Sequence, residues 1–339
     1  MKTITLNNPG EFSIGDAAEP TDVPAGHALV RTRRVGICGT DWHAYHGRQP
    51  FFSYPRVLGH ELGVEVVAVN DPSAEVKEGD KCSVEPYLNC GQCVACRRGK
   101  GNCCIDLKVL GVHADGGMRE LIVVPTHKLH VSNKLSLDQL ALVETLGIGC
   151  HAVARAQVER DEHVLVLGAG PIGLSVIPFV QAAGAIAVVA DVSDSRLAFC
   201  RQHMNVKTTL DARGDLAEQL KQLPGGDLPT AIIDATGNPP SMMRCFDLLA
   251  HGGRIVYVGL FQGEVSFNDP NFHRRETTLL ASRNALPGDF KRIIRLIEQG
   301  VVDTTPWITH RASASAFIET LPRWLTPDAG VIKAMIDFD

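Results

Sequence analysis

The sequence predicts a two-domain α/β protein in which a doubly wound parallel sheet is inserted into a β-rich domain. Three observations predict this fold. Short, glycine-punctuated strand candidates fill the first part of the chain, apolar strands alternate with helical stretches from about residue 160, and a strand pattern returns at the end. With 339 residues and 45% apolar side chains, the chain is long enough to fill two cores.

The first part has the pattern of a β-rich domain. Its strand candidates include HALVRTRRVG (27–36), GVEVVAV (63–69) and KCSVEPYL (81–88), separated by Pro, Gly, Asn and Asp. No long amphipathic helix is evident there. We therefore expect this domain to span residues 1–148, with a cysteine-rich lobe at 85–110.

The second part has the alternation typical of a parallel sheet covered by helices on both faces. The strand candidates are HVLVLG (163–168), AIAVVAD (185–191), VKTTLD (206–211), TAIIDATG (230–237), RIVYVGL (254–260) and TTLLASR (277–283). We assign residues 149–276 to this sheet domain and 277–339 to a return into the β-rich domain. The returning part holds a helical apolar repeat at 290–297 and a closing strand in VIKAMIDF (331–338).

The net charge and the N-terminal sequence limit which partners and which cell compartment are expected. The formal net charge is -5 and no block of like charge occurs, which excludes a nucleic-acid polyanion as the expected partner. MKTITLNNPGEF has no basic patch followed by an apolar core, so we expect neither a signal peptide nor a membrane anchor, and a cytoplasmic location.

A dinucleotide fingerprint follows the first strand of the sheet domain. Residues 168–173 read GAGPIG, which is G-x-G-x-x-G between a strand and a helix. The next strand ends at Asp191, about 20 residues on, where a carboxylate meets a ribose 2′-hydroxyl and repels a 2′-phosphate, so NAD is preferred over NADP. The cofactor-binding residues are then Gly168, Gly170, Pro171, Ile172, Gly173, Asp191 and Arg196.

Cysteines are clustered in the lobe. Cys90, Cys93, Cys96 and Cys104 have the spacing C-x2-C-x2-C-x7-C, and four thiolates around zinc leave no ligand position open. The pattern indicates a structural zinc site. Cys103, beside Cys104, leaves the fourth ligand open to either residue.

Several motifs together resemble the zinc-containing medium-chain dehydrogenase/reductase family, which includes the alcohol and polyol dehydrogenases. They are CGTDWH (38–43), GHE (59–61), the cysteine lobe and GAGPIG, and the resemblance spans essentially the whole chain. It implies a GroES-like catalytic domain, an inserted Rossmann domain and an active-site cleft between them. The chain departs from the family at Gly63, which comes one place early with Val64 after it, and at Thr145, where proline is usual.

The resemblance also implies a catalytic zinc and a proton relay. Cys38, His60 and Glu144 correspond to the catalytic zinc ligands, and Glu61 to an acid that can approach or replace a ligand. One thiolate, one imidazole and one carboxylate leave a fourth position for water or substrate. Thr40 and His43 match the hydroxyl and imidazole that pass the substrate proton to solvent.

Further motifs resemble the bacterial L-galactonate dehydrogenase group and its sugar-acid and sugar dehydrogenase neighbours. They are FFSYPRVLGHE (51–61), VLGVHADGG (109–117), IDATGN (233–238), VGLFQGE (258–264) and SRNA (282–285). The expected reaction is hydride transfer from a secondary alcohol of a sugar acid, sugar or polyol to NAD, with two zinc ions per chain. Candidates for a substrate carboxylate are His46, Arg48, His113, Arg283 and Asn284.

Two other functions stay open at this point. One is a threonine-type amino-alcohol dehydrogenase, and the other is a non-catalytic, nucleotide-sensing relative, whose expected mark is the loss of a zinc ligand or relay residue. The expected partners are a small-molecule alcohol or sugar-acid substrate and further copies of this chain in a homodimer or homotetramer, with no nucleic acid and no membrane.

Overall fold

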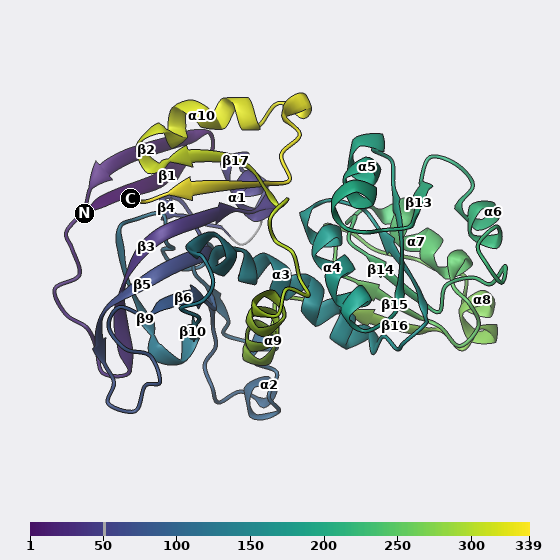
Figure 1. Ribbon diagram of the computed structural model, residues 1–339, viewed down its shortest axis with the longest axis horizontal. Helices are drawn as coiled ribbons and strands as arrows, with labels where there is room; N and C mark the ends of the chain where they lie inside the picture. The colour runs from purple at the N-terminus through teal and green to yellow at the C-terminus, as the bar shows by residue number, and fades with distance from the viewer. Residues whose placement is uncertain (50–51) are drawn as a thin grey trace. The chain divides into compact units, whose positions relative to one another are not determined.

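The computed structural model describes residues 1–49 and 52–339, which form two compact units (Figure 1). The β-rich domain consists of Met1–Thr145 together with Leu286–Asp339, and the sheet domain consists of Leu146–Ala285. The predicted organisation, with one domain inserted into the other, is therefore confirmed.

The domain boundaries differ from those that the sequence predicted. The second boundary follows Ala285 rather than residue 276, because β16 (Thr278–Ala281) pairs in parallel with β15 (Arg254–Tyr257) and so belongs to the sheet domain. The first boundary follows Thr145, inside a helix, rather than residue 148. Phe51, the start of the FFSYPRVLGHE motif, lies outside the described residues.

Most strands of the β-rich domain join one seven-stranded sheet in the order β10-β6-β5-β3-β18-β17, with β9 also paired to β3; β1, β2 and β4 form a second sheet, and β7 and β8 a third. The strands are β1 (Lys2–Asn8), β2 (Glu11–Asp16), β3 (His27–Ile37), β4 (Arg56–Val57), β5 (Glu61–Asn70), β6 (Lys81–Val84), β7 (Tyr87–Leu88), β8 (Lys108–Val109), β9 (Leu121–Pro125), β10 (Leu129–Val131), β17 (Ile308–Ser313) and β18 (Lys333–Asp337). β18 therefore returns from the C-terminal end to the side of β3.

The core of the β-rich domain follows from the alternation of its strands. In β3, Ala28, Val30 and Thr32 are buried while their neighbours are partly exposed, as the period of two requires for one covered face. Phe317 and Trp324, the first and last residues of helix α10 (Phe317–Trp324), pack into the same core. Full burial of each large apolar side chain contributes roughly 1.5–3 kcal/mol.

The sequence did not predict the long helix α3 (Leu137–Ala156). Nearly every residue from Leu140 to Val153 is buried, so the helix has no polar face and its sequence lacks an amphipathic period. The other helices of this domain are α1 (Gly39–Tyr45), α2 (Val94–Arg97), α9 (Pro287–Glu298) and α10 (Phe317–Trp324), with short 3-10 turns at Gly101–Cys103, Thr126–Lys128, Ala314–Ala316 and Pro327–Ala329.

The sheet domain is a six-stranded parallel sheet in the order β13-β12-β11-β14-β15-β16. All six predicted strands are present. Its elements are β11 (His163–Leu167), α4 (Pro171–Ala182), β12 (Ile186–Asp191), α5 (Asp194–His203), β13 (Thr208–Asp211), α6 (Leu216–Lys221), β14 (Ala231–Asp234), α7 (Pro239–Leu248), β15, α8 (Asp269–Arg274) and β16.

The strand order reverses at β11, with α4 and α7 on opposite faces of the sheet (Figure 1). This is the order 3-2-1-4-5-6 of the dinucleotide-binding fold, whose ligands bind beyond the carboxyl ends of the strands at the point of reversal. That point is where the GAGPIG turn leaves β11. Across residues 1–49 and 52–339, no helix combines the length and the apolar character that crossing a bilayer requires.

Candidate functional site

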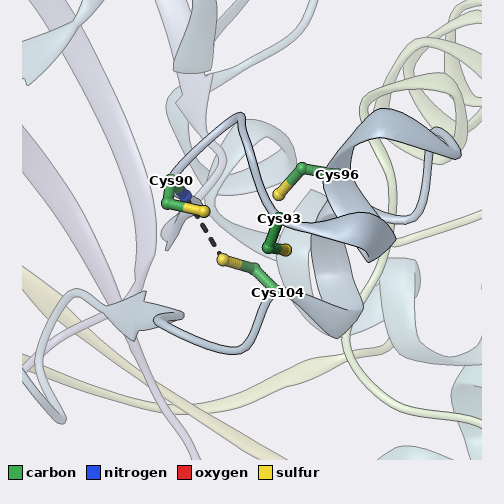
Figure 2. A group of neighbouring side chains, drawn as sticks. All are labelled: Cys90, Cys93, Cys96 and Cys104. Carbon is green, nitrogen blue, oxygen red and sulfur yellow. Dashed lines mark hydrogen bonds between the residues drawn. The ribbon is translucent and has the colours of Figure 1, made fainter.

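Four cysteine sulfurs converge in the lobe. The Sγ atoms of Cys90, Cys93, Cys96 and Cys104 all lie within 4.8 Å of one another, and Figure 2 shows them gathered from α2, the loop before it and the segment after it. The backbone N–H of Cys90 donates to Cys104 Sγ at 3.3 Å, which is the dashed line in Figure 2. Cys103 is exposed and is not part of this group, so Cys104 is the fourth member.

Backbone hydrogen bonds favour the thiolate form of Cys90 and Cys93. Hydrogen bonds from the backbone at Gln92 and Cys93 lower the pKa of Cys90, and those from Cys96 and Ile105 lower the pKa of Cys93 to about 6. At Cys104 the backbone hydrogen bond from Cys90 also lowers the pKa, but burial and side-chain hydrogen bonds with Cys90 and Cys96 outweigh it and raise the pKa to about 11. Thiolates are the form that binds zinc. Four thiol groups at this spacing fit a closed tetrahedral zinc site of the structural kind.

A second group brings together a thiol, an imidazole and a carboxylate. The ligand atoms of Cys38, His60 and Glu61 lie within 4.8 Å of one another, in the β-rich domain. Cys38 precedes α1 at the end of β3, while His60 and Glu61 stand at the start of β5, which pairs with β3. Strand pairing therefore assembles residues that are distant in the sequence.

Asp41 supports this group from α1. Its Oδ2 accepts a hydrogen bond from the backbone N–H of Cys38 at 2.9 Å, and its Oδ1 lies 3.8 Å from Nδ1 of His60. Burial raises the pKa of Asp41. Burial alone would lower the pKa of His60, but the charges of Asp41 and Cys38 outweigh burial and raise that pKa well above its ordinary value.

Glu144, on α3, is buried nearby and holds a different partner. The phenolic hydroxyl of Tyr87 donates a hydrogen bond to Glu144 Oε1. Burial raises the pKa of Tyr87 well above its ordinary value, so the phenol keeps its proton at neutral pH. Burial also raises the pKa of Glu144. Glu144 is not among the three residues whose ligand atoms share the 4.8 Å group, although its charge acts on His60.

Glu61 is paired with a lysine from the other end of the chain. Lys333 Nζ donates to both carboxylate oxygens of Glu61, at 2.7 and 2.8 Å. Burial alone would raise the pKa of Glu61, but the charge of Lys333 outweighs it and lowers that pKa. The carboxylate therefore stays ionised beside Cys38 and His60.

The side chains of this second group fit zinc. Nδ1 of His60 and Oδ1 of Asp41 are buried, and neither atom has a hydrogen-bond partner in the described part of the chain. The polar groups around the His60 ring therefore leave part of its hydrogen-bonding capacity unused. Thiol, imidazole and carboxylate are the donors of catalytic zinc sites, which keep one position for substrate. The two departures from the family pattern leave this group intact, and a Cβ on Gly63 would lie 2.2 Å from the carbonyl oxygen of Leu137, which explains glycine at that place.

Thr40 and His43 stand on α1 beside this group. Three positions separate them, which places them on one face of the helix. Thr40 is half-buried and His43 is exposed. The pair therefore extends from the side of Cys38 to solvent.

The GAGPIG turn has the backbone that a dinucleotide requires. Gly168 has φ +90°, which favours glycine, and a Cβ on Gly173 would lie 1.7 Å from the carbonyl oxygen of Gly168. A Cβ on Gly170 would meet only the Arg196 guanidinium, at 3.8 Å, so space is open above the N-terminus of α4. Pro171 and Ile172 form the first turn of that helix, whose amides attract phosphate.

Asp191 ends β12 and is turned toward this backbone. Its Oδ2 accepts from the N–H of Ala169 at 2.6 Å and its Oδ1 from the N–H of Ser193 at 2.7 Å. Arg196 Nη1 lies 3.9 Å from Oδ2. The carboxylate is thus fixed at the carboxyl end of the strand.

The candidates for a substrate carboxylate are divided between the two domains. His46, Arg48 and His113 are exposed in the β-rich domain, and the His113 ring accepts a hydrogen bond from the backbone of Val109. Arg283 and Asn284 belong to the sheet domain. Their contact with substrate stays a prediction.

Sequence reasoning missed Asp41, Tyr87 and Lys333. Asp41 stands inside the CGTDWH motif, and its place three residues after Cys38, at the start of a helix, was an available signal. Tyr87 and Lys333 reach the site only through tertiary contacts, 57 and 272 positions from their partners.

Two family models match the chain. The first, the alcohol dehydrogenase GroES-like domain, matches residues 24–134, and the second, the zinc-binding dehydrogenase, matches residues 171–299. The first lies in the β-rich domain and the second covers most of the sheet domain and the start of the returning segment. The expected GroES-like domain is thereby confirmed.

Relatives and solved structures cover nearly the whole chain. L-Galactonate-5-dehydrogenase of Escherichia coli K12 is 44% identical over 92% of each chain. 2-Dehydro-3-deoxy-L-galactonate 5-dehydrogenase of Pseudoalteromonas atlantica is 31% identical over 84% of each chain. The crystal structure of an alcohol dehydrogenase from Escherichia coli CFT073, complexed with NADH, has a TM-score of 0.92 and 29% identity, covering 100% of this chain and 99% of the other.

Proposed function

The chain belongs to the zinc-binding alcohol dehydrogenase family, and from that premise we propose that it oxidises a secondary alcohol of a hexonate such as L-galactonate with NAD. The observation that carries the proposal is the group formed by Cys38, His60 and Glu61. The substrate class is supported by the 44% identical relative, an L-galactonate-5-dehydrogenase, and by a second relative, a 2-dehydro-3-deoxy-L-galactonate 5-dehydrogenase.

We infer that Cys38 and His60 hold the catalytic zinc with Glu144 as third ligand. Glu61, which shares the 4.8 Å group, is the acid that can approach or replace a ligand. Cys90, Cys93, Cys96 and Cys104 hold the structural zinc. When bound, the catalytic zinc supplies Lewis acidity toward the substrate oxygen and NAD supplies the hydride acceptor.

The proton of the substrate hydroxyl leaves through residues of α1. The Thr40 hydroxyl accepts this proton and passes its own to the His43 imidazole, which is exposed and exchanges it with solvent. Half-burial of Thr40 and exposure of His43 support that direction of transfer. The relay ends at His43.

The cofactor is held by the GAGPIG turn and by Asp191. The open space at Gly170 and the amides of α4 accept the pyrophosphate, and the Asp191 carboxylate meets the ribose hydroxyls and repels a 2′-phosphate. Arg196 stands beside both. We therefore expect NAD to be preferred over NADP.

A substrate panel tests the proposed reaction. NADH formation is measured with L-galactonate, other hexonates, hexoses, polyols and L-threonine, with NADP as the control cofactor. The proposal expects the highest kcat/KM for a hexonate with NAD. Preferential turnover of L-threonine would instead support the amino-alcohol dehydrogenase, and cofactor binding without turnover of any alcohol would support the nucleotide-sensing relative.

We propose further that copies of this chain associate as a homodimer or homotetramer in the cytoplasm. β16 forms one edge of the six-stranded sheet, and Leu279 on it is 38% exposed, so a second copy has an apolar strand to pair with. A reducing compartment keeps the lobe thiols free for zinc. Size-exclusion chromatography with light scattering is expected to give a molar mass of two or four times that of one chain. Leu279→Lys is expected to reduce this molar mass.

A further inference from the structure

Lys333 forms a fully buried ion pair inside the proposed zinc site. Its Nζ donates to both oxygens of Glu61, at 2.7 and 2.8 Å, and to the carbonyl oxygen of Ile37 at 3.2 Å. The lysine is 2% exposed and the glutamate 1%. Two hydrogen bonds to one carboxylate fix its orientation as well as its charge.

Three neighbouring strands supply the residues that form and surround this ion pair. Lys333 is the first residue of β18, Glu61 the first of β5, and Ile37 the last of β3, which lies between them. The returning C-terminal segment therefore supplies the ammonium to a group that the N-terminal segment assembles.

A glycine provides the room for the carboxylate. Gly36 lies opposite Glu61 in the register of β3 and β5, and a Cβ on Gly36 would lie 2.1 Å from Glu61 Oε2. Any side chain at position 36 would displace the carboxylate from Lys333. The orientation of Glu61 is therefore built into the sheet.

The same carboxylate is within reach of a metal. The ligand atoms of Glu61, Cys38 and His60 all lie within 4.8 Å of one another, so one glutamate stands between an ammonium group and the zinc ligands. Glu144, the other buried glutamate, is bound by Tyr87 instead. Each glutamate thus has a resident partner of its own.

We propose that Lys333 is a positioning residue that holds Glu61 away from the zinc, so that this carboxylate does not join the three protein ligands and the water or substrate oxygen as a fifth ligand. The inference rests on the proposed function, because it concerns the same zinc site. Without the ammonium, an unpaired buried carboxylate would have the zinc as its nearest cation, and buried charges require a partner.

The formal charges agree with this role. The thiolate of Cys38 and the carboxylates of Asp41, Glu61 and Glu144 carry four formal negative charges, and zinc and Lys333 supply three positive ones. If Lys333 were neutral, the net negative charge of this buried site would increase by one, and ligation of Glu61 would bring its carboxylate closer to the positive metal. Catalytic zinc sites, unlike structural ones, can expand from four ligands to five.

Cobalt substitution reads the number of ligands directly. Chelator-treated protein is loaded with Co²⁺, whose visible absorption is intense in four-coordinate and weaker in five-coordinate sites, and bands from the cysteine lobe cancel in difference spectra between variants. Lys333→Met is expected to weaken the second-site bands and to lower kcat roughly 10- to 100-fold. Lys333→Arg keeps the charge and is expected to retain the original spectrum.

A matched control separates positioning from simple loss of a buried ion pair. Lys128 is a second buried lysine in the same domain, and it pairs with Glu85 and Asn89 rather than with a member of the second group. Lys128→Met is expected to lower thermal stability while the second-site cobalt bands stay unchanged. In Lys333→Met/Glu61→Gln no carboxylate is left to move, and the four-coordinate spectrum is expected to return.

The outcomes distinguish the inference from the proposed function. Full second-site bands in Lys333→Met would overturn the inference alone, as would weakened bands that persist in Lys333→Met/Glu61→Gln. If Lys333→Met does not fold, the double variant and Lys333→Arg decide: altered second-site bands in either of them would overturn the inference. Absence of second-site cobalt from the unmodified protein would overturn the proposed zinc site itself.

Discussion

Oδ1 of Asp41 lies 3.8 Å from Nδ1 of His60, and neither atom has a hydrogen-bond partner in the described part of the chain. The carboxylate thus faces the ring of a proposed zinc ligand, from a helix whose start it also caps through Cys38. In metal sites such a carboxylate orients the imidazole and increases its basicity.

Asp41→Asn is expected to weaken zinc at the second group by roughly 10- to 100-fold, because the amide keeps the shape but not the charge that orients His60. Chelator competition measures this affinity. Asp138→Asn, which alters a partly exposed carboxylate paired with Arg34 and Arg311, is the control and should leave the affinity unchanged. An unaltered affinity in Asp41→Asn would remove Asp41 from the metal site.

The adjacent residues Cys103 and Cys104 allow a test variant and a matched control in the lobe. Cys104→Ser is expected to remove the structural zinc and to lower the free energy of unfolding by more than about 2 kcal/mol, since loss of a structural metal is among the few large single-residue effects. Cys103→Ser is expected to change neither, because Cys103 is exposed and outside the cluster. Zinc content and thermal unfolding of both variants test this, and equal effects would contradict the assignment of Cys104.

Asp191 is expected to determine the choice between NAD and NADP. Asp191→Ala removes the charge that repels a 2′-phosphate, so the ratio of kcat/KM for NADP to that for NAD should rise. The same change leaves the N–H groups of Ala169 and Ser193 without their acceptor, which is expected to cost about 1–3 kcal/mol of stability. A fall in stability with an unchanged cofactor ratio would assign Asp191 a purely structural role.

Glu162 gives the sheet domain a pH-dependent contribution to stability. Burial alone would raise the pKa of Glu162, but the hydrogen bond and charge of Arg254 outweigh burial and lower that pKa. A lowered folded-state pKa stabilises the fold above the unfolded value of 4.5, and this contribution is lost as the pH falls through the folded pKa.

Urea unfolding across pH tests this expectation. Glu162→Gln should lower the free energy of unfolding at pH 7, and its difference from the unmodified protein should shrink as the pH falls below 4.5. Glu159→Gln, which changes an exposed neighbouring carboxylate, is the control. A difference that is constant with pH would show that Glu162 acts through packing rather than charge.

The sheet domain was the part of the fold most accessible from the sequence. Its strands are short and apolar, they alternate with helices, and the GAGPIG turn identifies the first of them. By contrast, α3 has almost no exposed face, so its sequence carries no period that distinguishes helix from strand. TTLLASR was predicted as a strand of the sheet domain, but the second boundary was placed before it, because the local pattern does not show where the chain leaves the sheet; the pairing of β16 with β15 places the boundary after Ala285.

In the candidate site, too, some features could be predicted from the sequence and others could not. The spacing of the lobe cysteines predicted a metal site, but it could not decide between the adjacent Cys103 and Cys104. Only the fold shows that Cys104 is buried within the group while Cys103 is exposed outside it. The glycine turn could be read from local backbone requirements. Tyr87 and Lys333 could not be predicted, because nothing local indicates which buried carboxylate a distant phenol or ammonium will pair with.

The most direct test of the zinc-dependent dehydrogenase is Cys38→Ser, measured for zinc content, NAD-dependent alcohol oxidation and NADH binding by fluorescence on the same preparation. The account predicts that one of two zinc ions per chain is lost, that turnover disappears and that NADH binding in the sheet domain is kept. Retained turnover with two zinc ions per chain would remove Cys38 from the metal site and contradict the account.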